Sequence, residues 1–231
     1  MAEQLLKKLQ VEKKELEWLY APDMEYCEYE NCKRCLQLII PYKRNWEENK
    51  KYPLILFIPG SAWHRQEMYN NIPARSELAK RGFAIAEMQY RESELAIFPA
   101  QVIDAKKAIR FIHSIAEQFH IDTENIFISG DSSGGHIALL AGLTAAYGEL
   151  DTDIKNNISC KVNGIISYCA PTDMFLSKGT GQMEDLLGTD HVANVPDLAK
   201  SASCGAYLSS EKYIPPVLMF HGLQDELVYG I

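Results

Sequence analysis

The sequence predicts an α/β fold, with a mostly parallel central sheet and helices on both faces. From Pro53 onward, short apolar runs alternate with segments of helical periodicity, a pattern typical of parallel strands joined by crossover helices. Apolar runs lead into loops at glycine or proline, as in PLILFIPG at 53–60, which is typical of buried strands. With 231 residues, 47% of them hydrophobic and 23% charged, the chain suits a single folded domain spanning 1–231.

The N-terminal region precedes this alternating pattern and has elements of its own. Leucines alternate with charged residues across 3–19, so residues 1–20 are predicted to form an amphipathic N-terminal helix docked on the body of the domain. A helix that binds a partner is the alternative interpretation. Residues 24–30 and 35–40 then predict two strands around a turn at Asn31.

The later elements are predicted from apolar periodicity and from glycine or proline at their ends. Buried strands are expected at 53–60, 164–169 and 216–222, further strands at 83–88 and 126–129, and helices at 73–81, from Pro99 onward and at 136–147. In the helix after Pro99, Lys106, Lys107 and Arg110 fall largely on the side opposite the apolar stripe and are expected to be exposed. Residues 174–208 are more polar and are expected to form a cap-like insertion over the strand ends.

A G-x-S-x-G pattern at 130–134 predicts a nucleophilic serine. The GDSSG segment follows a short apolar strand and opens a buried helix, so it suits a sharp strand-to-helix turn that presents Ser132 at the carboxyl end of the sheet. The helix N-terminus adds partial positive charge there, and the amide of Ser133 is expected to donate to an oxyanion. GDSSGG also suggests a trypsin-like protease, but those enzymes are all-β and the long helix here excludes them.

Further segments carry a resemblance to a known family. They are PGSAW at 59–63, YR at 90–91 followed by FPA at 98–100, GDSSGGH at 130–136, DLLG at 185–188 and HGLQDELV at 221–228. With these segments the chain, from about Cys35 to its end, resembles the α/β-hydrolase fold, in particular small esterases and lipases with an H-G-G-G-W type loop. The resemblance implies hydrolysis of carboxylic esters with small acyl groups, such as acetyl esters of carbohydrates, without a cofactor.

The resemblance also implies roles for individual residues. Gly60, Ser61 and Ala62 stand where the family has three glycines, so the backbone amides of Ser61 and Ala62 would complete an oxyanion hole with that of Ser133. The departures are Pro59 in place of the histidine and side chains at two of the three glycine positions. Asp225 stands where the family has its triad carboxylate, with Glu226 as the adjacent alternative.

The histidine of the triad is expected beyond residue 231. In this fold the triad follows the chain order serine, acid, histidine, and no histidine follows Asp225. The sequence is therefore expected to be C-terminally truncated, to lack the last strand and helix, and to be inactive unless another base serves. His64, beside the oxyanion loop, is the candidate surrogate, whereas His136 is expected to pack beneath the turn. A non-catalytic scaffold that binds a ligand or partner, and a serine peptidase or amidase, remain the alternative functions.

Charge and cysteine content limit the partners. The net charge of −8 disfavours nucleic acid and anionic membranes, and neither a membrane-spanning run nor a signal-peptide core is present in the sequence. A small-molecule ester, a cytoplasmic location and free thiols are expected, with homo-oligomers through an exposed edge strand as an open possibility. Cys27, Cys32 and Cys35 follow one iron–sulfur spacing, but their place in a predicted strand pair favours free thiols and no metal.

Overall fold

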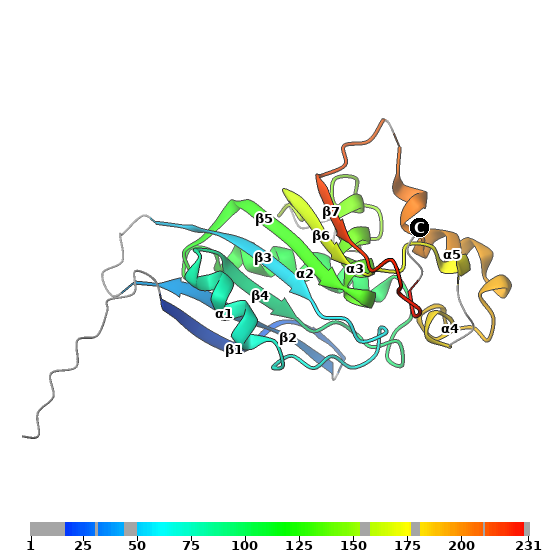
Figure 1. Cartoon of the computed structure of the whole chain (residues 1–231), viewed down its shortest axis with the longest axis horizontal. Helices are drawn as coiled ribbons and strands as arrows, with labels where there is room; N and C mark the ends of the chain where they lie inside the picture. The colour runs from blue at the N-terminus through cyan, green and yellow to red at the C-terminus, as the bar shows by residue number, and fades with distance from the viewer. Residues whose placement is uncertain are drawn as a thin grey trace, which may run out of the picture.

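A seven-stranded sheet forms the centre of the computed structural model, which describes residues 17–30, 32–43, 50–152, 158–176, 181–209 and 211–228 (Figure 1). The strand order is β1-β2-β4-β3-β5-β6-β7. The strands are β1 (Glu17–Tyr29), β2 (Cys32–Tyr42), β3 (Tyr52–Ile58), β4 (Ala84–Met88), β5 (Ile121–Asp131), β6 (Gly164–Tyr168) and β7 (Val217–Phe220). Strands β1 and β2 are antiparallel to their neighbours, and β4, β3, β5, β6 and β7 pair in parallel. The predicted fold class is confirmed.

The predicted N-terminal helix is wrong at its end. Residues 17–20 belong to β1, which pairs with β2 along its length; residues 1–16 lie outside the described residues. Opposite the apolar run of β2 stand Trp18, Leu19 and Tyr20. This pairing between strands decides the structure of these residues and overrides the helical preference that the local leucine pattern indicates. The predicted turn residue, Asn31, lies outside the described residues; β1 ends at Tyr29 and β2 begins at Cys32.

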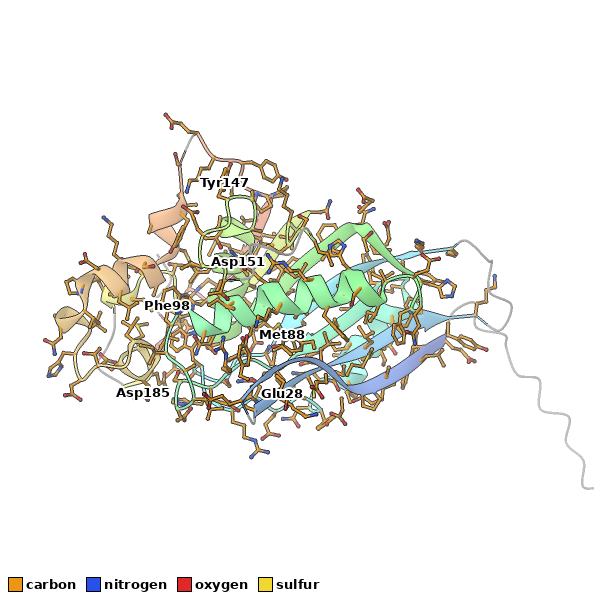
Figure 2. All side chains as sticks on the ribbon, turned by 180° about the vertical axis from the view of Figure 1, so that it is seen from behind. Glu28, Met88, Phe98, Tyr147, Asp151 and Asp185 are labelled. Carbon is orange, nitrogen blue, oxygen red and sulfur yellow. The ribbon has the colours of Figure 1, made fainter. Side chains whose placement is uncertain are left out.

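Helices cover both faces of the sheet. They are α1 (Ile72–Lys80), α2 (Ala100–Ile115), α3 (Ser132–Thr144), α4 (Gln182–Leu187) and α5 (Pro196–Ala202). In Figure 1, α1 lies in front of the sheet and α2 and α3 lie behind it, and Figure 2 shows α2 crossing the sheet from the other side. Side chains alternate accordingly along β3: Leu54 and Leu56 join the large core under α2 and α3, whereas Ile55 packs with the α1 cluster.

The prediction that Lys106 and Arg110 are exposed is wrong. Both are buried, at 0% and 7% relative exposure, because α2 packs against the end of α3 on the side predicted to face water. Lys106 Nζ donates to the carbonyls of Thr144 and Glu149, and Arg110 pairs with Asp151 at 2.5 Å. Each buried cation thus has the partners that burial requires.

The prediction of a buried strand at 216–222 is right about the strand and wrong about its burial, since the four side chains of β7 are exposed. Among the described strands β7 lies at the edge of the sheet and pairs only with β6. Leu218 is 53% and Phe220 48% exposed, and Phe220 stacks on Tyr168 of β6 with ring centroids 4.9 Å apart. Burial depends on neighbours that the apolar composition of a strand does not reveal.

Short helices gather at the carboxyl end of the parallel strands. Besides α4 and α5, these are the 3₁₀ turns η1 (Met174–Leu176), η2 (Val192–Asn194) and η3 (Cys204–Tyr207), which lie at one end of the sheet in Figure 1. The Phe98 amide donates to the Leu186 carbonyl at 2.8 Å, which joins this group to the loop before α2. Among the described helices, none combines the length and apolar content needed to cross a bilayer.

Candidate active site

Ser132 occupies a strained turn between β5 and α3. Its φ is +51°, in the left-handed region that costs a non-glycine residue about 1–2 kcal/mol. Strand β5 ends at Asp131 and α3 begins at Ser132, so the serine stands at the N-terminus of a 13-residue helix whose dipole favours negative charge. Every residue from Ser133 to Thr144 is buried, and the helix therefore holds the turn rigidly.

Glycines surround this turn because backbone segments approach closely. A Cβ at Gly134 would lie 2.0 Å from the Ile58 carbonyl oxygen, and one at Gly130 would lie 2.4 Å from the carbonyl carbon of Gly134. In the facing loop, a Cβ at Gly60 would lie 2.9 Å from the Ser132 Cβ. Real Cβ atoms essentially never come so close to other atoms, so the close approach of β3, α3 and the loop after β3 requires glycine at these positions.

Replacement of Gly134 by alanine is expected to destabilise the fold by about 3 kcal/mol or more, because the clash is with backbone and overpacking against backbone cannot relax cheaply. Urea unfolding measures the change. Gly205→Ala is the matched control, since no atom lies within 4 Å of a Cβ there, and its effect should stay within about 0.5 kcal/mol. Equal unfolding free energies for the two variants would contradict this account of the turn.

A small cavity lies beside Ser132. Its volume is about 60 Å³, enough to hold more than one water molecule. It is lined by residues from the loops at the strand ends and from the short helices, namely Ala62, Trp63, Ser132, Ser133, Pro171, Thr172, Asp173, Leu176, Gln182, Met183, Leu227 and Val228. The predicted site residues Ala62, Ser132 and Ser133 therefore meet at one cavity.

Ser61 does not line this cavity, and its amide is engaged elsewhere. The Ser61 N–H donates to Ser133 Oγ at 2.9 Å, so this amide has an acceptor inside the protein, whereas Ala62, the other predicted donor of the loop, lines the cavity. The buried Tyr90 hydroxyl lies 2.8 Å from Ser61 Oγ and 3.2 Å from both Ser133 Oγ and the Pro59 carbonyl oxygen. These contacts fix the loop after β3 against the start of α3, a role that sequence reasoning did not assign to Tyr90.

His136 is buried beneath the turn, as predicted. Its Nδ1 accepts the indole N–H of Trp63 at 3.1 Å, and its Nε2 lies 2.7 Å from the Ala202 carbonyl oxygen. Because an indole nitrogen is only a donor, Nδ1 must be the unprotonated nitrogen and Nε2 carries the proton. Burial lowers the pKa of His136 to about 4, so the ring is neutral at physiological pH.

The neutral His136 makes the stability of the fold depend on pH. Between the ordinary pKa of 6.5 and the folded-state pKa of about 4, the unfolded chain binds a proton that the folded ring does not. The stability is therefore complete above pH 6.5 and falls as the pH drops toward 4, by about 3 kcal/mol in total. Urea unfolding at about pH 7, 5.5 and 4.5 measures this loss.

The matched variant for this pH dependence is His136→Gln, which has no ionisable ring and should lose less stability over the same range. The comparison is needed because Glu87 acts with the opposite sign: burial raises its pKa to about 6, so its contribution to stability falls as the pH rises from 4.5 to 6. Equal pH dependence in the wild type and His136→Gln would contradict the burial of a neutral ring.

Asp225 lies in a turn after β7. Its Oδ1 accepts the N–H groups of Leu227 and Val228, both at 2.9 Å, and these two residues line the cavity beside Ser132. The Asp225 carboxylate itself does not line the cavity. Its Oδ2 lies 3.6 Å from His221 Nε2, which also contacts the Val228 carbonyl at 2.8 Å. The predicted acid is thus hydrogen-bonded to two residues that line the cavity.

His64, the candidate surrogate base, lines another pocket, together with Glu94 and Asp185. Its Nδ1 lies 2.7 Å from Glu94 Oε1, and its Nε2 lies 3.5 Å from Asp185 Oδ2; Asp185 and Phe98 lie at the same end of the molecule in Figure 2. All six histidines of the sequence fall in the described ranges. None of these described histidines lines the cavity beside Ser132, so no general base is assigned from them.

The cysteines of the C-x4-C-x2-C pattern lie in the β1–β2 hairpin. Cys27 stands opposite Arg34, Cys32 opposite Tyr29 and Cys35 opposite Glu25, and all three are free thiols. Burial raises the pKa of Cys27 to about 11. Within the described residues, no three His, Cys, Asp or Glu side chains gather as a metal site would require.

The sheet order, the strained serine turn and the cavity at the strand ends define an α/β-hydrolase fold. The chain belongs to the BD-FAE family, whose model matches residues 40–230.

Relatives and solved structures agree with this assignment. Esterase LipC of Mycobacterium tuberculosis is 25% identical over 197 residues, which are 82% of this chain and 48% of LipC. A truncated form of carbohydrate esterase from gut microbiota superposes with a TM-score of 0.76 at 26% identity, over 94% of this chain and 81% of that one. A bifunctional GH43-CE from Bacteroides eggerthii has the same TM-score at 27% identity, over 90% of this chain and 31% of that one. The chain spans about half the length of the curated relatives it matches.

Proposed function

We propose that the protein hydrolyses carboxylic esters through an acyl-serine intermediate on Ser132. The observation that supports this most is the strained Ser132 at the N-terminus of α3, in one cavity with Ala62 and Ser133. Attack of Oγ on the ester carbonyl would form a tetrahedral oxyanion, and the C–O bond to the alcohol would break as the Oγ proton passes to the leaving oxygen. Water would then cleave the acyl–Oγ bond, release the acid and return the proton to Oγ. The amides of Ala62 and Ser133 are the proposed oxyanion donors, Asp225 is the proposed acid, and Ser61 supports the loop.

Short acyl groups on a carbohydrate alcohol are the proposed substrate class. The cavity of about 60 Å³ has room for an acetyl-sized group, and two structural neighbours carry carbohydrate esterase or CE in their names. Residues Leu176, Gln182 and Met183 of the short helices line the same cavity, in keeping with a cap-like role for 174–208. A cytoplasmic location is part of this proposal, from sequence charge and composition alone.

Trapping of the acyl-enzyme tests the proposal. The protein is mixed briefly with p-nitrophenyl acetate, quenched in acid and digested, and the peptide that contains Ser132 is measured by mass spectrometry. We expect one acetyl group on Ser132 and none in Ser132→Ala. Acetylation at another residue, or equal labelling of both proteins, would overturn the proposal and favour a non-catalytic scaffold.

Residues 1–231 on their own are expected to turn over p-nitrophenyl acetate at no more than about a thousandth of the whole protein's rate, the scale of loss when a triad member is missing. The reason is that none of their histidines lines the cavity at Ser132. Initial rates of both proteins, each with its Ser132→Ala counterpart, measure this. Full Ser132-dependent activity in residues 1–231 would instead assign the base to one of their histidines, with His64 and His221 tested first.

A further inference from the structure

The loop that supplies the proposed oxyanion donor is strained at two successive residues. Ala62 has a φ of +54° and Trp63 a φ of +61°, and a left-handed backbone costs each non-glycine residue about 1–2 kcal/mol. Such strain persists only where the surroundings fix the backbone. Ala62 lines the cavity beside Ser132, so the position of its amide depends on whatever holds Trp63.

Trp63 is held from two directions. Its carbonyl accepts the Ser93 N–H at 2.9 Å and the Ser93 hydroxyl at 3.2 Å. The residue is 3% exposed, and its indole donates to His136 Nδ1 at 3.1 Å. The two rings meet edge-on, with ring centroids 5.3 Å apart and planes at 89°. Ser93 belongs to the neighbouring loop, whereas His136 belongs to the helix that begins with Ser132.

Through this arrangement the nucleophile and the loop are both held by the same helix, α3. Ser132 starts α3 and His136 follows four residues later, about one helical turn away. The helix is rigid and buried, so the hydrogen bond to His136 fixes Trp63, and with it the adjacent Ala62, relative to Ser132. The other imidazole nitrogen contacts the carbonyl of Ala202, the last residue of α5.

We propose that His136 is a positioning residue: it holds the Ala62 amide in register with Ser132 through Trp63, and it connects α5 to the same loop. The catalytic consequence rests on the proposed ester hydrolysis, while the positioning of the loop does not. His136 touches neither the substrate nor the reacting atoms; it acts through Trp63. A misplaced donor is expected to lower turnover more than substrate binding, because the oxyanion forms only along the reaction path.

Nitrogen-15 NMR of the whole protein, combined with ester kinetics of the same protein, tests this inference. The Trp63 indole signal is assigned with Trp63→Phe, and the Ala62 amide is followed in His136→Leu, His136→Gln and the control His113→Leu. We expect His136→Leu to shift both signals and to lower kcat about 10²-fold, the scale of a misplaced catalytic group, with KM within about twofold. A glutamine side chain can both accept and donate, so His136→Gln should restore most of both readouts, and His113→Leu should leave them unchanged.

Unchanged Trp63 and Ala62 signals in a folded His136→Leu protein would overturn the inference, as would a change in KM alone with kcat intact. If His136→Leu does not fold, Trp63→Phe tests the same bond, because it keeps an aromatic ring and removes the N–H; an unshifted Ala62 amide there overturns the inference. Absence of ester hydrolysis in every protein contradicts the proposed function, while the two NMR signals still decide whether His136 positions the loop.

Discussion

Ser132→Ala in the whole protein is expected to lower kcat/KM for p-nitrophenyl acetate by about 10⁴-fold or more, the scale seen when a serine nucleophile is removed. Without Oγ no acyl-enzyme forms, and only the oxyanion donors and the cavity remain to assist water. The free energy of unfolding should change little. Ser132 is half-buried and lines the cavity, and alanine is no larger than serine at the start of a helix. Initial rates and urea unfolding measure the two effects separately.

The matched control is Ser133→Ala, which keeps the backbone amide of residue 133 and loses its hydroxyl. That hydroxyl accepts the Ser61 N–H at 2.9 Å and lies 3.2 Å from the Tyr90 hydroxyl. Loss of this hydroxyl leaves the Ser61 N–H without its acceptor and loosens the loop. We therefore expect kcat/KM to decrease about tenfold, which corresponds to about 1.4 kcal/mol of transition-state stabilisation. Equal rates for the wild type and a folded Ser132→Ala protein would contradict the nucleophile and support the scaffold alternative.

The order of elements and the serine turn could be predicted because both depend on local sequence. Alternating apolar runs and helices predict a parallel sheet, and the glycines around Ser132 reflect contacts between residues of the same turn, such as Gly130 with Gly134. The start of α3 is harder to predict. The helix begins at Ser132, whereas apolar periodicity predicts a start at 136, because the small residues of the first turn are not apolar enough to show the pattern.

The loop after β3 could not be predicted in the same way, because its contacts come from distant segments. Ser61 meets Ser133 and Trp63 meets His136, pairs that are 72 and 73 residues apart in the sequence. A resemblance identifies the loop and its approximate donors, but whether an amide is already occupied depends on these tertiary hydrogen bonds. For the same reason periodicity predicts that Lys106 faces water, whereas its ammonium group donates to the carbonyls of Thr144, the last residue of α3, and of Glu149.

Asp225→Asn is expected to lower kcat about 10⁴-fold if Asp225 is the triad acid, because an amide cannot stabilise the imidazolium and favours the wrong tautomer of the base. Asparagine is the informative change at this position. Its Oδ1 can still accept the Leu227 and Val228 N–H groups, both at 2.9 Å in the wild type, so the turn at the rim of the cavity is retained. Asp225→Ala would remove the turn and the charge together.

Glu226→Gln is the matched control, since it removes the neighbouring carboxylate and keeps the turn. A large decrease of kcat in Glu226→Gln, with little change of kcat in Asp225→Asn, would identify Glu226 as the acid. Wild-type kcat in both variants, with Ser132→Ala still inactive, would mean that the acid lies on another segment and that Asp225 serves the turn alone. His221 Nε2 lies 3.6 Å from Asp225 Oδ2, so His221→Gln separates two roles of Asp225: an unchanged pH profile of kcat/KM would mean that Asp225 acts on a base other than His221.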